Sequence, residues 1–158
     1  MTFLYFAYAS NLFTKRMRLN CPSAKPKCVA ELKNFRFAFI EYADLWKGGC
    51  ATIVEDDVDS VWGVVWEISK EHEEALNKQE VGYTPIHVKV YKDNVELPCK
   101  TYQRPPCIGI SKPSLIYKTV FVRGAKEHGL PEWYIKKLEA IEDNGYVGPV
   151  GVPVDIEV

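Results

Sequence analysis

The residues with the clearest chemical potential form the turn at residues 8–12, which follows the first apolar run of the chain. It reads Tyr8-Ala9-Ser10-Asn11-Leu12. Where a strand runs into a helix, the first backbone N–H groups of the helix lack intrahelical acceptors, and they favour an anion. The pattern therefore indicates a cradle for a carboxylate or a developing oxyanion. It is equally typical of an ordinary strand-to-helix turn, so the local pattern alone does not define a site.

Glu80 is the candidate acid–base residue. It lies at the end of a helix predicted to begin near Ser69 and to stop near Gly82. A carboxylate at a helix C-terminus opposes the helix dipole, which disfavours its ionised form and raises its pKa. A raised pKa is what a general acid–base needs at neutral pH. From spacing alone, a solvated surface glutamate that tolerates a small penalty remains the alternative.

Tyrosine and cysteine side chains offer further candidates. Tyr83, Tyr102 and Tyr117 carry phenol groups that could orient a polar ligand, although aromatic packing with a satisfied hydroxyl is the usual alternative. The cysteines are expected to be small buried hydrophobes rather than nucleophiles, and they are Cys21, Cys28, Cys50, Cys99 and Cys107. None forms a C-x-x-C pair, and the three histidines show no ligand spacing, so no metal site is predicted.

Strands and helices predicted from hydrophobic periodicity must position these residues. Strands are expected over 3–8, 28–32, 35–42, 50–54, 61–66, 86–90 and 95–103. The run 61–66 is almost wholly apolar and should be buried on both faces, whereas the polar residues 56–60 predict a turn. Helices are expected over 12–20, with Ser10 and Asn11 as N-caps, from Ser69 to about Gln79, over 114–128, and from Pro131 to about Ile141. This order predicts a mixed α/β domain of the α+β type, with a bent or barrel-like sheet and flanking helices.

The composition of the whole chain narrows the function further. The 158 residues fit one domain, covering 1–158, and the net charge of −1 argues against a general nucleic-acid binder. No apolar stretch approaches the ~20 residues that span a bilayer. The amino terminus does not read as a signal peptide, so we expect a cytoplasmic protein with free thiols. The common dinucleotide, P-loop and serine-hydrolase motifs are absent.

Read together, these segments resemble the γ-glutamylcyclotransferase family, most closely its cytosolic eukaryotic type. The family's Tyr-Gly-Ser-Asn-Leu turn stands here at 8–12, and its Gln-Glu at a helix end stands as Gln79-Glu80. Further matching runs follow in the same order within residues 3–148, namely Gly48–Ile53, Val61–Trp66, Gly124–Pro131 and Leu138–Glu142. The ordered blocks favour a functional role for the turn and for Glu80 over the structural alternatives.

The resemblance implies a small barrel-like fold and a cofactor-independent enzyme of glutathione metabolism that often forms a homodimer. Its substrate is a γ-glutamyl-amino acid, whose own α-amino group attacks the γ-carbonyl and expels the amino acid, leaving 5-oxoproline. Glu80 would be the acid–base catalyst. The turn residues Tyr8, Ala9, Ser10, Asn11 and Leu12, together with Tyr83 and Tyr117, would bind the substrate. No metal, nucleic acid or membrane partner is implied.

Two departures from the family pattern keep other functions open. Ala9 stands where the family has glycine, and the segment from Glu80 to Tyr83 is shorter than in the cyclotransferase type. The shorter segment is compatible with γ-glutamylamine substrates such as γ-glutamyl-ε-lysine. Ala9 is compatible with a catalytically inactive homologue that acts as a binding or interaction protein.

Overall fold

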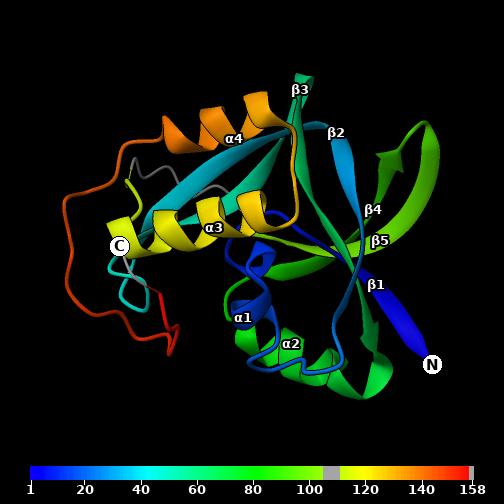
Figure 1. Cartoon of the computed structure of the whole chain (residues 1–158), viewed down its shortest axis with the longest axis horizontal. Helices are drawn as coiled ribbons and strands as arrows, with labels where there is room; N and C mark the ends of the chain where they lie inside the picture. Colours follow the sequence, from blue (N-terminus) through cyan, green and yellow to red (C-terminus); the bar gives the residue numbers. More distant parts are fainter. Residues whose placement is uncertain (105–110, 157–158) are drawn as a thin grey trace.

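A closed five-stranded barrel forms the centre of the molecule in the computed structural model, which describes residues 1–104 and 111–156 (Figure 1). The strands are β1 (Thr2–Ala7), β2 (Lys25–Ala43), β3 (Gly48–Ser69), β4 (Thr84–Lys92) and β5 (Val95–Gln103). They follow the order β1-β3-β2-β4-β5, and a parallel pairing of Tyr5 with Lys100 closes β5 onto β1. The other pairings are antiparallel. The predicted barrel-like α+β fold is confirmed.

The two longest strands each join segments that the sequence separates. β2 contains the predicted strands 28–32 and 35–42, and β3 contains 50–54 and 61–66. The turn predicted over 56–60 is wrong as an interruption, because β3 continues through it. Lys33 pairs with Ser60 and Phe35 pairs with Glu55, so residues 56–59 bulge opposite Asn34, whose φ is 67°. The polar residues of this segment form the bulge, in which the Asp56 carboxylate accepts hydrogen bonds from the N–H groups of residues 58 and 59.

The β4–β5 hairpin follows its prediction. Asp93 and Asn94 both have positive φ, at 48° and 66°, as a two-residue turn between twisted antiparallel strands requires. Along β4 the half-buried and exposed side chains alternate from Ile86 to Lys89. β5 ends at Gln103, the end predicted for this strand. Pro105 and Pro106, which follow it in the sequence, lie outside the described residues.

The helices agree with the predictions except near the amino terminus and at the start of the second helix, where a 3-10 turn precedes α2 instead of a helix beginning near Ser69. They are α1 (Thr14–Met17), α2 (Glu73–Gln79), α3 (Leu115–Glu127) and α4 (Glu132–Glu139), with short 3-10 turns η1 (Ser10–Leu12) and η2 (Lys70–His72). The helix predicted over 12–20 is therefore far shorter. Past Met17 the chain turns towards α2, where the Asn20 amide donates to Gln79. Ser10 and Asn11 lie inside η1 rather than capping a helix, and neither 3-10 turn has a side-chain cap.

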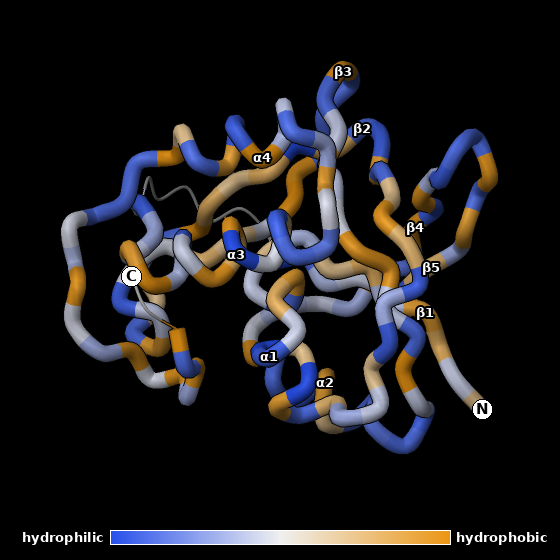
Figure 2. Tube along the Cα trace, viewed as in Figure 1, coloured by the Kyte–Doolittle hydropathy of each residue, from blue (hydrophilic) through white to orange (hydrophobic). Residues whose placement is uncertain are grey.

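Helices α3 and α4 lie side by side against the long strands (Figure 1). Phe121 of α3 contacts the rings of Phe37 and Phe39 on β2, and Trp133 of α4 meets the ring of Trp62 on β3. Most of the 61–66 run is buried as expected, and Trp62 alone in it is half-buried. Figure 2 shows apolar stretches along the barrel strands and polar stretches at the hairpin tips. No helix in the described ranges has the length and apolar character needed to cross a membrane.

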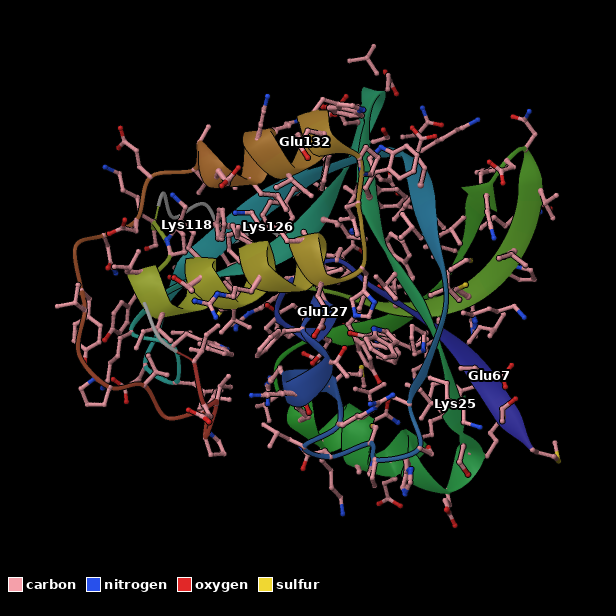
Figure 3. The ribbon with its side chains drawn as sticks, viewed as in Figure 1. Lys25, Glu67, Lys118, Lys126, Glu127 and Glu132 are labelled. Carbon is pink, nitrogen blue, oxygen red and sulfur yellow. The ribbon has the colours of Figure 1, made fainter. Side chains whose placement is uncertain are left out.

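Helix α1 is held in place from α3. The Glu127 carboxylate at the C-terminal end of α3 accepts the Thr14 backbone N–H at 2.9 Å and the Thr14 hydroxyl at 2.6 Å. Figure 3 shows Glu127 on the side of α3 that faces α1. A carboxylate at a helix N-terminus satisfies free N–H groups and complements the dipole. This contact fixes the start of the short helix that carries Arg16.

Candidate active site

A cavity of about 260 Å³ opens beside the turn 8–12. The turn, the end of α2, the β2–β3 connection, the end of β5 and α3 all contribute to its lining. Of the residues that the sequence singled out as a site, seven line this cavity: Tyr8, Ala9, Ser10, Asn11, Glu80, Tyr83 and Tyr117. Leu12 does not. Its side chain is fully buried and belongs to the hydrophobic core.

Asn11 and Glu80 form the centre of a hydrogen-bond network in this cavity. The Asn11 amide nitrogen donates to Glu80 Oε1 at 2.7 Å and to the Tyr5 hydroxyl at 2.9 Å. Its amide oxygen accepts from Gln79 Nε2 at 3.0 Å. The side chain of Asn11 thus uses both of its N–H groups and its oxygen within the network. The carboxylate of Glu80 consequently has a defined position at the end of α2.

Burial dominates the electrostatics of Glu80. It raises the pKa of the Glu80 carboxyl above its usual value, while Arg16 and the hydrogen bonds from Asn11 and Gln79 act in the opposite direction. The net effect is a carboxyl group that holds its proton to higher pH than a solvated glutamate does. Such a group is better suited than a solvated glutamate to accept a proton and to return it.

The turn itself is anchored from two sides. The Trp66 indole N–H donates to the Asn11 carbonyl at 3.0 Å in the buried core. On the other side, a Cβ at Gly124 of α3 would lie 2.5 Å from the Leu12 carbonyl carbon, so only glycine allows this close approach. The N–H groups of Leu12 and Phe13 donate to the carbonyls of Ala9 and Ser10. The N–H groups of Ser10 and Asn11 therefore remain at the start of η1 without an intrahelical acceptor.

Ala9 does not adopt the left-handed conformation that favours glycine. Its φ is −134° and its ψ is −120°, a combination outside the regular helix and strand regions. Ala9 lines the cavity and is half-buried. The alanine that stands in place of the family glycine therefore does not have to hold a left-handed backbone.

Tyrosine hydroxyl groups tie the cavity wall together. Tyr83 donates to the Ala51 carbonyl at 2.6 Å, and the Ala51 N–H donates to the Tyr117 oxygen at 2.9 Å. Tyr8 donates to the Tyr102 carbonyl at 2.6 Å. Because Tyr117 accepts in its bond to Ala51, its own hydroxyl hydrogen stays available for a ligand. Tyr102, a candidate from the sequence, also lines the cavity, and its hydroxyl donates to Asn77.

Arg16 is a cavity residue that the sequence analysis did not single out. The basic residues at 15, 16 and 18 predicted a surface helix, yet Arg16 is 6% exposed and lines the cavity. Its guanidinium lies 5.6 Å from the centre of the Trp46 ring, and its Nε is buried without a hydrogen-bond partner. One local signal was available: Arg16 follows the buried Leu12 by four residues, the spacing that puts two side chains on one helical face.

The cysteines and histidines show no catalytic arrangement in the described ranges. Cys50 lines the cavity, but burial raises the pKa of its thiol to about 12, so it is not a thiolate at neutral pH. Cys21, Cys28, Cys50 and Cys99 are free thiols, and Cys107 lies outside the described residues. Within residues 1–104 and 111–156, no group of three or more His, Cys, Asp or Glu side chains could hold a metal ion.

Comparisons with known proteins give a consistent family. A model described as the AIG2-like family matches residues 60–138. A protein from Bos taurus named gamma-glutamylcyclotransferase is 43% identical over 98% of this chain and 86% of its own length. A protein of the same name from Homo sapiens is 41% identical over the same shares. A solved structure named gamma-glutamyl cyclotransferase matches with a TM-score of 0.90 and 42% identity, covering 95% of this chain and 94% of its own.

Proposed function

Because this chain belongs to the AIG2-like γ-glutamylcyclotransferase family, we propose that it converts γ-glutamyl-amino acids into 5-oxoproline and a free amino acid. The observation that carries the proposal is the Glu80 carboxylate, which meets Asn11 of the turn at 2.7 Å inside the cavity. The family defines the reaction, and this contact supports Glu80 as its acid–base group.

Glu80 would move the protons of the reaction. The attacking α-amino group arrives protonated at neutral pH, and the ionised Glu80 takes one proton from it. The free amine then adds to the γ-carbonyl carbon and gives a tetrahedral centre. The protonated Glu80 returns its proton to the leaving nitrogen as the C–N bond breaks. The ionised Glu80 then takes the second proton from the new ring nitrogen and passes it to the departing amine. The substrate ammonium has thus lost two protons, the amino acid leaves as an ammonium, and Glu80 is ionised again. A raised pKa favours the second transfer and still permits the first.

The turn would hold the γ-glutamyl group and stabilise charge. The N–H groups of Ser10 and Asn11, at the start of η1, suit a carboxylate or the oxyanion of the tetrahedral centre. Arg16 adds a buried positive charge to the same end of the cavity. Ring closure requires the chain of the substrate to fold back on itself, so a preorganised cavity lowers the entropic part of the barrier.

The proposal is tested by incubating the purified protein with γ-glutamyl-alanine and measuring 5-oxoproline. We expect turnover by the wild type and a loss of about 10²–10⁴-fold in Glu80→Gln. Glu74→Gln is the matched control, because Glu74 lies on the same helix, where it is exposed and pairs with Lys78 at 3.4 Å. Equal turnover by the Glu80→Gln and wild-type proteins would refute the role of Glu80.

The same assay distinguishes two alternative functions. Turnover confined to γ-glutamylamines, such as γ-glutamyl-ε-lysine, would identify the protein as a γ-glutamylamine cyclotransferase. No turnover with either class would favour a binding or interaction protein. The near full-length match to proteins named gamma-glutamylcyclotransferase supports the amino-acid substrates.

The family resemblance also suggests an oligomeric state and a cellular location. We propose a homodimer in the cytoplasm, taking part in glutathione metabolism. The four described cysteines are free thiols, which agrees with a reducing compartment. Sedimentation equilibrium of the purified protein measures the assembly directly, and a monomer at all concentrations would reject it.

A further inference from the structure

Arg104 is a second cationic residue of the cavity, and the acid–base chemistry proposed above does not use it. It directly follows β5 and is half-buried, and its backbone is held by two hydrogen bonds with the Thr52 hydroxyl, each of 2.9 Å. Its side chain lines the cavity. The backbone anchor gives the guanidinium a rigid base from which to meet a ligand.

The guanidinium of Arg104 lies at the open end of the cavity, against the short loop after Glu80. The Tyr83 N–H donates to the Glu80 carbonyl at 3.1 Å, and Gly82 has a φ of 84°, so the loop is a tight turn. A Cβ on Gly82 would lie 3.3 Å from Arg104 Nη1. Gly82 is exposed and its neighbour Val81 is 80% exposed, which places this contact at the mouth.

No carboxylate in the described ranges forms an ion pair with Arg104. Two carboxylates line the cavity, Glu80 and Asp44. Asp44 is bound to Lys47 at 2.8 Å, and Glu80 is held by Asn11. A guanidinium offers five N–H donors in a planar fork that fits a carboxylate. Arg104 therefore presents an uncompensated anion-binding group to the cavity.

The two arginines serve different ends of the cavity. The charge of Arg16 lowers the pKa of Glu80, and Arg104 is not among the groups that shift it. Both arginines act on the pKa of Cys50, and Arg104 does so more strongly. Arg16 is thus the cation of the Glu80 end, and Arg104 is the cation on the Cys50 side, towards the mouth.

We infer that Arg104 binds the α-carboxylate of the leaving amino acid and so selects γ-glutamyl-amino acids over γ-glutamylamines. This rests on the proposed function. The γ-glutamyl group must lie deep, beside Glu80 and the turn, so the leaving group extends from the scissile bond towards the mouth. In a γ-glutamyl-amino acid the leaving group carries a carboxylate one carbon from the scissile nitrogen. In a γ-glutamylamine that carboxylate is missing, and Arg104 would keep only its contacts with water.

The test compares two substrates that differ only in this group, γ-glutamyl-alanine and γ-glutamyl-ethylamine. We expect Arg104→Met to lower kcat/KM for γ-glutamyl-alanine by about 10–100-fold, as loss of a charged hydrogen-bonded pair does. The kcat/KM of Arg104→Met for γ-glutamyl-ethylamine should stay within about threefold of the wild-type value, because this substrate has no carboxylate for Arg104 to contact. Arg16→Met is the comparison variant, and it should lower both substrates by similar factors. An unchanged ratio between the two substrates in Arg104→Met would overturn the inference.

A binding measurement separates this inference from the proposed function. In the Glu80→Gln background, calorimetry gives the affinities of both compounds without turnover. We expect γ-glutamyl-alanine to bind more tightly than γ-glutamyl-ethylamine, and Arg104→Met to remove most of that difference. If the wild type turns over neither compound but the difference between their affinities depends on Arg104, the proposed reaction is wrong and the carboxylate site stands. If both compounds turn over and the difference between their affinities is the same with and without Arg104, the carboxylate site is wrong and the proposed reaction stands.

Discussion

The side chain of Asn11 donates to Glu80 at 2.7 Å across a sequence separation of 69 residues. This bond joins the turn after the first strand to the end of α2, and it gives the carboxylate a fixed place in the cavity. Neither residue marks a site from its local sequence alone, since a turn asparagine and a helix-end glutamate are both common surface features. The hydrogen bond between them gives the cavity one buried carboxylate with a defined partner, which is the group we propose for acid–base catalysis.

The pH dependence of the reaction should report this bond. A hydrogen bond donated to a carboxylate favours its ionised form, and Asn11 lowers the pKa of Glu80 in this way. In Asn11→Ala the pKa of Glu80 should rise, so the acidic limb of the kcat/KM profile should move to higher pH. The measurement is a profile from pH 4 to 9 with γ-glutamyl-alanine for both proteins.

Asn20→Ala is the control for that profile. Asn20 contacts Gln79 at the outer edge of the network and does not contact Glu80, so its limb should stay in place. The substrate's amine titrates identically in every protein, and a shift between proteins therefore reports Glu80. An acidic limb at the same pH in Asn11→Ala and wild type would contradict the assignment.

Glu80 should also lower the stability of the folded protein at neutral pH. Its pKa is raised in the folded state, because burial outweighs the attraction of Arg16. Between the unfolded and folded pKa values the folded state binds more protons, so the free energy of unfolding falls as pH rises through this window. Glu80→Gln imitates the neutral form and keeps an oxygen to accept from Asn11. We expect it to raise the free energy of unfolding at pH 7 by about 0.5–2 kcal/mol.

Urea unfolding at several pH values measures this effect. The gain of Glu80→Gln over wild type should shrink as pH falls from the folded pKa of Glu80 towards its unfolded value. It should vanish below about pH 4, where the wild-type carboxyl is protonated in both states. Glu74→Gln should show no gain, since Glu74 is exposed on the same helix. A Glu80→Gln protein less stable than wild type at pH 7 would show that the ionised carboxylate stabilises the fold.

Ala9 should be compatible with activity. Its φ of −134° lies outside the left-handed region that favours glycine, so Ala9→Gly should cost about 0.4–1 kcal/mol of stability through the greater freedom of the unfolded chain. We expect kcat/KM of Ala9→Gly to stay within about threefold of wild type, because the backbone path does not change. Ala9→Val, whose larger side chain would enter the cavity, should lower it. A tenfold gain in Ala9→Gly would mean that the Ala9 methyl obstructs the substrate.

Local patterns in the sequence determined a large part of this structure. Capping, turn chemistry and hydrophobic period predict several features that the structure has: the end of α2 at Glu80, the two-residue turn at Asp93 and Asn94, the helix that begins after Ser114, and the mostly buried run 61–66. Each of these features depends on residues within one element or its ends. For that reason they can be predicted from a single sequence.

Only the tertiary structure decided what distant segments do to one another. Nothing near Arg16 in the chain shows that Trp46 would cover it, and the basic residues around it are typical of a solvated helix. Nothing near Leu12 shows that Gly124 would press against it and direct its side chain into the core. The residues 56–59 form a bulge within one long strand because β2 supplies the partners on both sides. Strand pairing and burial depend on contacts between segments. The periodicity of one segment shows which of its faces is buried, but it does not show which other segment buries that face.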